Sequence, residues 1–97
     1  MKIVWLDEAL RELEEAALYY GDIDNEPGER FSTAAEVAVA MIKARPEMSR
    51  KFDGQMRKVR LKSFPYSVVY SLDDSALRIL SVMHLHREPG CWHERME

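Results

Sequence analysis

The spacing of apolar residues predicts a short strand and then two helices in the first half of the chain. Residues 2–6 form an apolar run with a β-branched pair and a tryptophan, which predicts a strand. Asp7 is a favourable N-cap for the helix that follows. The apolar stripe of this helix has spacings of three and four and consists of Leu10, Leu13, Ala17 and Tyr20. Off this stripe we expect three side chains to face solvent, those of Glu12, Glu14 and Glu15.

A second amphipathic helix is predicted over residues 29–45. Its apolar stripe consists of Phe31, Ala35, Ala38 and Ile42. This stripe is widened by Ala34, Val37 and Met41. Pro46 ends the helix, because proline cannot continue the helical hydrogen bonds. Residues 21–28 contain several helix breakers and form the predicted turn between the two helices. Two helices joined in this way form a helical hairpin.

The second half of the chain changes to the alternating pattern of β-strands. Residues 46–55 are predicted to be a polar connector, and strands are predicted over residues 56–62, 66–72 and 76–85. The order β-α-α-β-β-β predicts an α+β fold, in which the helical hairpin packs on one face of a largely antiparallel four-stranded sheet. We expect residues 1–97 to form a single domain, because a chain of this length builds one core.

Composition and charge restrict the function classes. The one cysteine, Cys91, excludes an internal disulfide, and no apolar run approaches the roughly 20 residues that cross a bilayer. We therefore expect a cytoplasmic protein without membrane contact. The net charge of −3 is unevenly divided, because residues 1–42 hold three bases and ten acids while residues 43–62 hold eight bases and two acids. This asymmetry is compatible with a polyanion or an acidic partner near the middle block, but the charge pattern alone favours the simpler interpretation of a solvated basic strand and loop.

Three cations alternate along the strand predicted over residues 56–62. Lys58, Arg60 and Lys62 share one sheet face, while Val59 and Leu61 share the face toward the helices. A basic, open sheet face is suited to phosphate contacts or to an acidic protein segment.

Four residues near the C-terminus belong to types that bind zinc, namely His84, His86, Cys91 and His93. The two strand histidines point the same way, but the spacing of the four residues matches no closed zinc pattern. The four glycines are scattered and form no phosphate-binding loop. We therefore expect neither a metal nor a cofactor.

The order of several residues along nearly the whole chain resembles a known family. Trp5 in the first strand, Tyr19-Tyr20 at the end of the first helix and Phe31 at the start of the second are followed by Arg57 and Phe64-Pro65-Tyr66. The C-terminal part of the pattern consists of His84, Arg87, Pro89, Trp92 and Arg95. This ordered set resembles the RelE/ParE toxin superfamily of type II toxin–antitoxin modules and is most similar to its ParE-like, plasmid-stabilisation branch.

The resemblance implies a toxin that a cognate antitoxin protein neutralises by binding it in a hetero-oligomer. ParE-like members are similar to gyrase poisons and are not enzymes, so we expect DNA gyrase to be the target of the free protein. We expect antitoxin contacts on the apolar and basic sheet surface that includes Lys58, Arg60 and Tyr66, and on the exposed side of the helices. We expect the residues for toxicity to be Arg87, Trp92 and Arg95.

The alternative that the resemblance offers is a RelE-like endonuclease that cuts mRNA on the ribosome. Its catalytic residues would be Lys58, Arg60, His84 and Arg87, with His86 as a second candidate for the base. The arginine that this active site needs after Tyr66 is Ser67 here, and Leu85 and Cys91 stand where a second arginine and a tyrosine belong. These departures favour the ParE-like branch. A third interpretation is a member of the family that is not toxic and only binds its partner.

Overall fold

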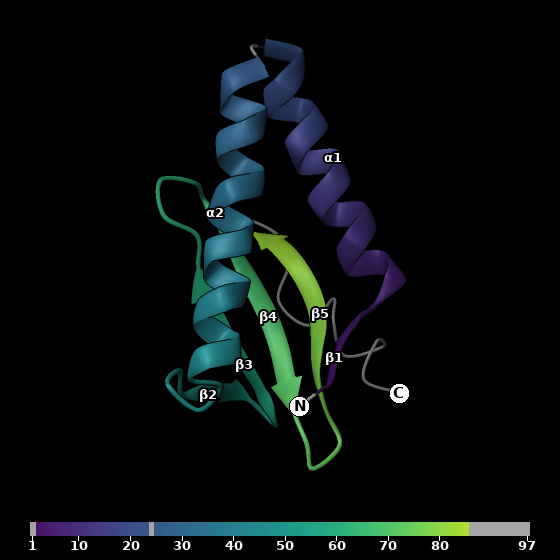
Figure 1. Cartoon of the computed structure of the whole chain (residues 1–97), viewed down its shortest axis with the longest axis vertical. Helices are drawn as coiled ribbons and strands as arrows, with labels where there is room; N and C mark the ends of the chain where they lie inside the picture. Colours follow the sequence, from purple (N-terminus) through teal and green to yellow (C-terminus); the bar gives the residue numbers. More distant parts are fainter. Residues whose placement is uncertain (1, 24, 86–97) are drawn as a thin grey trace.

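Five strands and two helices form the part of the chain that the computed structural model describes, which is residues 2–23 and 25–85 (Figure 1). In chain order they are β1 (Lys2–Trp5), α1 (Asp7–Ile23), α2 (Asn25–Ala44), β2 (Lys51–Asp53), β3 (Met56–Arg60), β4 (Tyr66–Leu72) and β5 (Ala76–His84). Neither helix of this part is long and apolar enough to cross a membrane.

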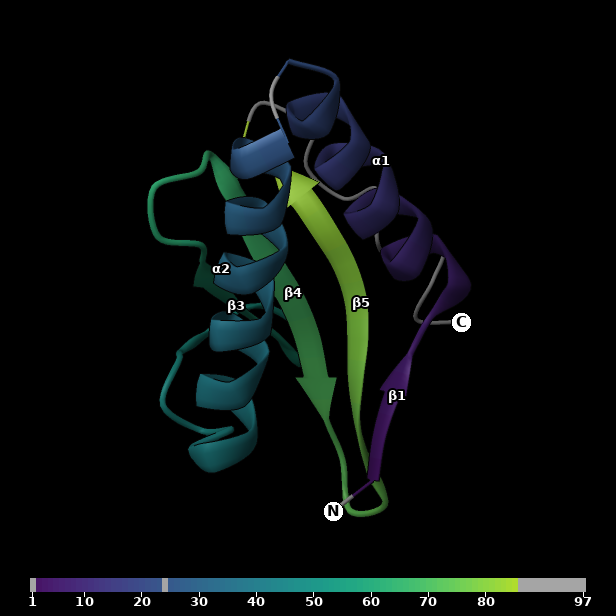
Figure 2. The same ribbon diagram turned by 45° about the horizontal axis from the view of Figure 1, so that its top comes forward.

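The strands form one sheet in the order β1-β5-β4-β3-β2. β1 runs parallel to β5, and the other three neighbouring pairs are antiparallel. The two helices lie side by side on the same face of this sheet, as Figures 1 and 2 show. The predicted α+β fold, with a helical hairpin on a largely antiparallel sheet, is confirmed.

The sheet has one strand more than the four that were predicted. Residues 46–55, predicted as a connector, contain β2, in which Lys51 pairs with Arg57 of β3. Gly54 makes the tight turn between the two strands, and its φ of 58° is a conformation that glycine adopts without a steric penalty. A strand of three residues is too short to display an alternating pattern, so the polar composition alone indicated a loop.

Both helices extend further into the predicted turn than the sequence indicated. α1 continues to Ile23 and α2 already begins at Asn25, four residues before the predicted start. Pro27 is compatible with this early start, because a proline in the first turn of a helix removes an N–H that has no partner within the helix. The helix breakers therefore mark the junction between the helices without forming a long loop.

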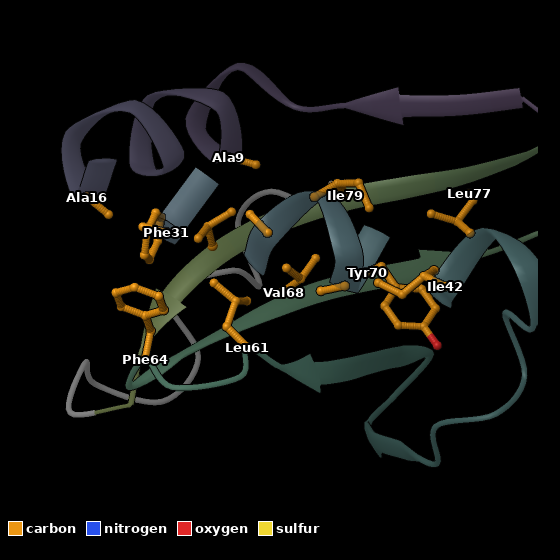
Figure 3. Close-up of a cluster of buried hydrophobic side chains, with 13 residues drawn as sticks. Ala9, Ala16, Phe31, Ile42, Leu61, Phe64, Val68, Tyr70, Leu77 and Ile79 are labelled. Atoms are coloured by element: carbon orange, nitrogen blue, oxygen red, sulfur yellow. The ribbon is translucent and has the colours of Figure 1, made fainter. Parts of the chain in front are cut away.

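The main hydrophobic core fills the space between the helices and the sheet (Figure 3). The stripe predicted for α2 is confirmed, since Phe31, Ala35, Ala38 and Ile42 are all buried. The stripe predicted for α1 is partly wrong, because Ala9 and Ala16 are buried whereas Leu10 is 40% exposed. The buried residues Ala9, Glu12 and Ala16 follow one another at spacings of three and four, so the buried face of α1 is turned by one position from the predicted stripe and Leu10 lies beside it.

Aromatic side chains join the two helices to the end of the sheet. The ring of Tyr20 stacks on that of Phe31 with centroids 5.4 Å apart, and both rings meet Phe64 edge-on at 5.0 and 5.1 Å. Tyr66 packs edge-on against Phe31 at 5.0 Å. Burial of Tyr20 raises the pKa of its hydroxyl, as does the neighbouring Tyr19. The Tyr19-Tyr20, Phe31 and Phe64-Pro65-Tyr66 strings of the sequence thus meet in one cluster that stabilises the fold.

Glu12 is buried, contrary to the prediction that it faces solvent, because it closes an open sheet edge. β1 pairs with β5 only as far as Ile79, and a β-bulge in β5 at Leu80 follows directly. Beyond this point α1 lies over the edge, where Glu12 Oε1 accepts hydrogen bonds from Ser81 Oγ at 2.9 Å and from the backbone N of Val82 at 3.2 Å. The carboxylate thus takes the place of a strand neighbour for β5.

Hydrogen bonds from the side chains of Tyr70 and Arg57 fix the segment between α2 and β2. Tyr70 of β4 donates a hydrogen bond from its hydroxyl to the carbonyl of Pro46 at 2.7 Å. Arg57 of β3 donates to the carbonyls of Ser49 at 2.7 Å and Glu47 at 3.3 Å. Arg57 therefore has a structural role that the pattern of cations along β3 did not indicate.

The turn between β4 and β5 depends on the carboxylate of Asp73. Its Oδ1 accepts hydrogen bonds from the backbone N of Ser75, the backbone N of Ala76 and the hydroxyl of Ser75, each at 2.9 Å. Arg78 forms an ion pair with its other oxygen. These hydrogen bonds, chiefly those from the two backbone amides, lower the pKa of Asp73 from 3.8 to about 2.

Replacing Glu12 tests whether its hydrogen bonds to the edge of β5 stabilise the fold. Glu12→Ala should lower the free energy of unfolding by about 1–3 kcal/mol, because it leaves the N–H of Val82 buried without an acceptor. Glu12→Gln keeps an acceptor oxygen and should retain most of the stability. Urea unfolding at pH 7 measures both variants. Equal losses for alanine and glutamine would show that the hydrogen bonds to the oxygen are not what stabilises this edge.

The pKa of Asp73 predicts how acid affects the turn. Because the folded pKa of about 2 is below 3.8, the carboxylate stabilises the fold above pH 3.8 and this contribution is lost as the pH falls from 3.8 through 2. In urea unfolding over this range, Asp73→Asn should lose less stability than the wild type. Asp74→Asn is the matched control, because it removes a charge from the same turn but none of these acceptors. Parallel curves for the wild type and Asp73→Asn would contradict the assignment.

Candidate functional site

A groove of about 780 Å³ lies between the outer side of α2 and the turn from β3 to β4. Figure 2 shows this turn beside α2, on the side away from α1. The apolar lining consists of Ala34, Val37, Ala38, Met41 and Phe64. The polar lining consists of Glu29, Arg30, Thr33, Arg60, Lys62 and Ser63.

The floor of the groove is a second apolar stripe of α2, which borders the buried stripe and shares Ala38 with it. Ala34, Val37, Ala38 and Met41 have the spacing i, i+3, i+4 and i+7, which places them in one line along the helix. Val37 is 53% exposed and Met41 is 45% exposed. α2 is therefore apolar over more of its surface than the sheet covers, which is typical of a helix that also contacts a partner.

The opposite wall of the groove has an unusual backbone. Ser63 adopts a φ of 70°, which side chains with a Cβ rarely occupy. Next to it Phe64 is buried against Tyr20 and Phe31, so that the aromatic cluster fixes this end of the turn. Strained residues that the surrounding structure holds in place are common at binding sites.

Positive charge predominates around the groove. Arg30 of α2 and both Arg60 and Lys62 on the opposite wall line it, against one carboxylate, that of Glu29. All four of these residues are exposed. An apolar floor with a basic rim is suited to an amphipathic partner that carries acidic side chains.

The structure places the three predicted antitoxin contacts in different surroundings. Arg60 lies on the rim of the groove. The ammonium group of Lys58 lies 4.8 Å from the centre of the Phe52 ring, in a cation–π contact with β2. Tyr66 belongs to the aromatic cluster and meets His84 edge-on at 5.0 Å. The three side chains therefore do not form one continuous patch.

The endonuclease residues within the described part also lie apart. Val59 packs against the core on the helix side, so its neighbour Lys58 leaves β3 from the opposite face, whereas Arg60 at the end of the strand lines the groove. His84 contacts Tyr66, which packs against that same core. In addition, β4 lies between β3 and β5 in the sheet. The cations and the histidine are thus not assembled around one point.

The remaining predicted residues lie outside the described part of the chain. These are Arg87, Trp92 and Arg95, together with His86, Cys91 and His93 of the zinc alternative. Within residues 2–23 and 25–85, no three His, Cys, Asp or Glu side chains are placed to hold a metal ion.

Sequence reasoning found the basic side of the groove but not the groove. Arg60 and Lys62 were part of the predicted stripe of cations, whereas Arg30 was not singled out. Ala34, Val37 and Met41 were predicted to widen the apolar stripe of the second helix, but the structure leaves Val37 and Met41 about half exposed on the floor of the groove. The available signal was the number of apolar positions on α2, which exceeds what one buried face requires.

Comparisons with known proteins agree with this fold. Residues 3–89 match the family model described as the ParE toxin of the type II toxin–antitoxin system parDE. A chain in the solved structure "Chromosomal ParDE TA system from P. aeruginosa" is similar with a TM-score of 0.68 and 18% sequence identity, over 89% of this chain and 97% of that one. No curated protein matches the sequence.

The backbone of Ser63 gives a prediction for the groove wall. Ser63→Gly should raise the free energy of unfolding by roughly 0.5–1 kcal/mol, because glycine adopts positive φ without the steric cost that serine has. Ser63→Val should lower it, since a β-branched residue is still less suited to this conformation. Thermal unfolding followed by circular dichroism measures both changes. A glycine variant that is less stable than the wild type would show that the wall is not strained.

Proposed function

Because the chain belongs to the ParE toxin family of type II toxin–antitoxin systems, we propose that in its free form it inhibits DNA gyrase and that a ParD-type antitoxin neutralises it by binding. The observation that carries this proposal is the family match over residues 3–89. Inhibition of gyrase would take place in the cytoplasm, where the chromosome is, and the toxin would there be held in a hetero-oligomer until the antitoxin is lost.

The arrangement of the described residues supports inhibition by binding over cleavage of RNA. General acid–base catalysis requires its groups to be within hydrogen-bond reach of one substrate, and Lys58 and His84 leave the sheet on opposite faces. Ser67, which stands where the RelE-like active site has an arginine, is buried within β4. A hydroxyl at this position does not supply the positive charge that stabilises a scissile phosphate.

We propose different surfaces for the two activities of the toxin. Arg87, Trp92 and Arg95 are the proposed contacts with gyrase, on the basis of the C-terminal pattern in the sequence. Lys58, Arg60 and Tyr66 are proposed contacts with the antitoxin, and the position of Arg60 on the groove supports its assignment most directly.

Expression of the chain alone tests the proposed function. We expect growth arrest, induction of the SOS response and trapped gyrase–DNA cleavage complexes, and we expect purified toxin to inhibit supercoiling by gyrase. The triple variant Arg87→Ala, Trp92→Ala, Arg95→Ala should lose these effects. Arg50→Ala is the matched control, because it removes an exposed cation far from this segment in sequence.

Two other outcomes of this experiment would contradict the proposed function. Rapid loss of translation with cuts in mRNA, and without SOS induction, would overturn the gyrase assignment in favour of an endonuclease. Normal growth with a folded wild-type protein, as judged by circular dichroism, would show that the chain is not toxic.

A further inference from the structure

Exposed cations gather where α2 ends and β2 and β3 begin. Residues 43–58 contain six bases and two acids, whereas the rest of the chain contains eight bases and fifteen acids. We infer that this part of the surface, here called the basic end, binds duplex DNA through its phosphate backbone. The exposed cations of the basic end are Lys43, Arg45, Arg50, Lys51 and Lys58. The inference does not depend on whether the chain inhibits gyrase.

Hydrogen bonds hold the three segments of the basic end together. The hydroxyl of Tyr70 donates to the carbonyl of Pro46, and Arg57 donates to the carbonyl of Ser49, so the segment that follows α2 is fixed against β3 and β4. Lys51 of β2 pairs with Arg57 of β3, which places these two strands side by side. Figure 1 shows this end of the molecule at the lower left. The cations therefore lie on a surface whose backbone is already ordered, which favours binding.

The charge of the basic end is not neutralised within the protein. Among residues 2–23 and 25–85, no carboxylate forms an ion pair with any of its five exposed cations. Residues 1–42, which include β1, α1 and most of α2, hold ten acids and three bases. A solvated surface usually mixes both signs of charge, whereas this molecule separates them. A polyanion would therefore be attracted to the basic end and repelled by the helical hairpin.

The composition of the basic end is closer to that of a DNA interface than to that of a protein interface. The exposed large apolar residues between positions 43 and 58 are Met48 and Phe52, and the exposed cations outnumber them. The centre of a protein–protein interface is depleted in charged residues. Protein–DNA interfaces are more polar and much more positively charged. This difference favours DNA over an acidic protein segment.

The contact between Lys58 and Phe52 favours a duplex over a single strand. The ammonium group of Lys58 lies 4.8 Å from the centre of the Phe52 ring, and the ring is 37% exposed. Single-stranded nucleic acids bind by stacking their bases on exposed aromatic rings. Because Lys58 already occupies one face of this ring, Phe52 is better suited to holding a cation toward a phosphate than to stacking on a base.

The salt dependence of DNA binding tests the inference. Fluorescence anisotropy measures the affinity of the purified full chain for a labelled duplex of 20 base pairs, from 50 mM salt upward. The logarithm of the association constant should fall linearly with the logarithm of the salt concentration, with a slope of about −0.9 for each phosphate contacted and so about −4.5 for five contacts. Two duplexes of unrelated sequence should bind equally, because the phosphate backbone carries no sequence information.

Two matched double variants locate the binding. Lys43→Gln together with Lys51→Gln should weaken the duplex at least about tenfold at 50 mM salt and make the slope less steep by about two. Lys2→Gln together with Arg11→Gln is the matched control, because it removes the same charge from two exposed residues outside the basic end. Lys2 lies on β1, at the opposite edge of the sheet from β2, and Arg11 lies on α1. The control should keep the slope of the wild type. Circular dichroism verifies that both variants are folded.

Several results would overturn the inference. They are the absence of duplex binding at 50 mM salt, an affinity that does not change with salt, and equal effects of the two double variants. Tighter binding of a single strand of the same length than of the duplex would show that the bases are bound instead of the duplex backbone. A chain that binds duplex DNA as expected but does not arrest growth would contradict the proposed function and leave this inference intact.

Discussion

The pairing of the first strand with the last one is the constraint on which the rest of this structure depends. β1 and β5 are parallel neighbours, so the chain has to cross the sheet after β1 before it can form the antiparallel strands. The two helices make this crossing and, as Figure 1 shows, they cover one face of the sheet. The position of β1 therefore determines which face is covered and where α2 lies.

The surface features follow from this arrangement. β1 is shorter than β5, and the uncovered part of β5 is the place where α1 contributes the carboxylate of Glu12. α2 lies further across the sheet and contacts β3 and β4. Its buried stripe faces the sheet, and the second stripe is left beside the turn from β3 to β4. The edge closure and the groove are thus two consequences of one crossing.

The sequence predicted those parts of the fold that depend on periodicity within one element. Phe31, Ala35, Ala38 and Ile42 repeat with helical spacing, and they are buried as predicted because this spacing places all four on the face of α2 that packs against the core. Glu12 was predicted wrongly, because its burial depends on a backbone N–H seventy residues later in the chain. β2 was missed for a related reason, since its three residues acquire their structure from the pairing with β3.

In the candidate site too, the sequence predicted features within one element but not contacts between elements. Arg60 and Lys62 were identified from their alternation, whereas Arg30 joins them only because α2 passes beside the turn that contains Lys62. No sequence pattern within either segment predicts that the two segments lie close together. The φ of Ser63 was equally hidden, because the aromatic packing of Phe64 fixes the turn from outside.

The hydrogen bonds of Glu12 along the edge of β5 also affect whether the protein aggregates when no partner is bound. An open strand edge is a template for pairing with another chain, and such pairing leads to aggregation. On β5, Glu12 accepts the hydrogen bond of the backbone N–H that another strand could otherwise bind. On β3, Lys58 and Arg60 place charges along the part of the strand that is not paired with β2. The outermost strands, β1 and β2, have only four and three residues, so the edges of the sheet offer little backbone for pairing with another chain. The chain can therefore stay dispersed when no partner protein covers it.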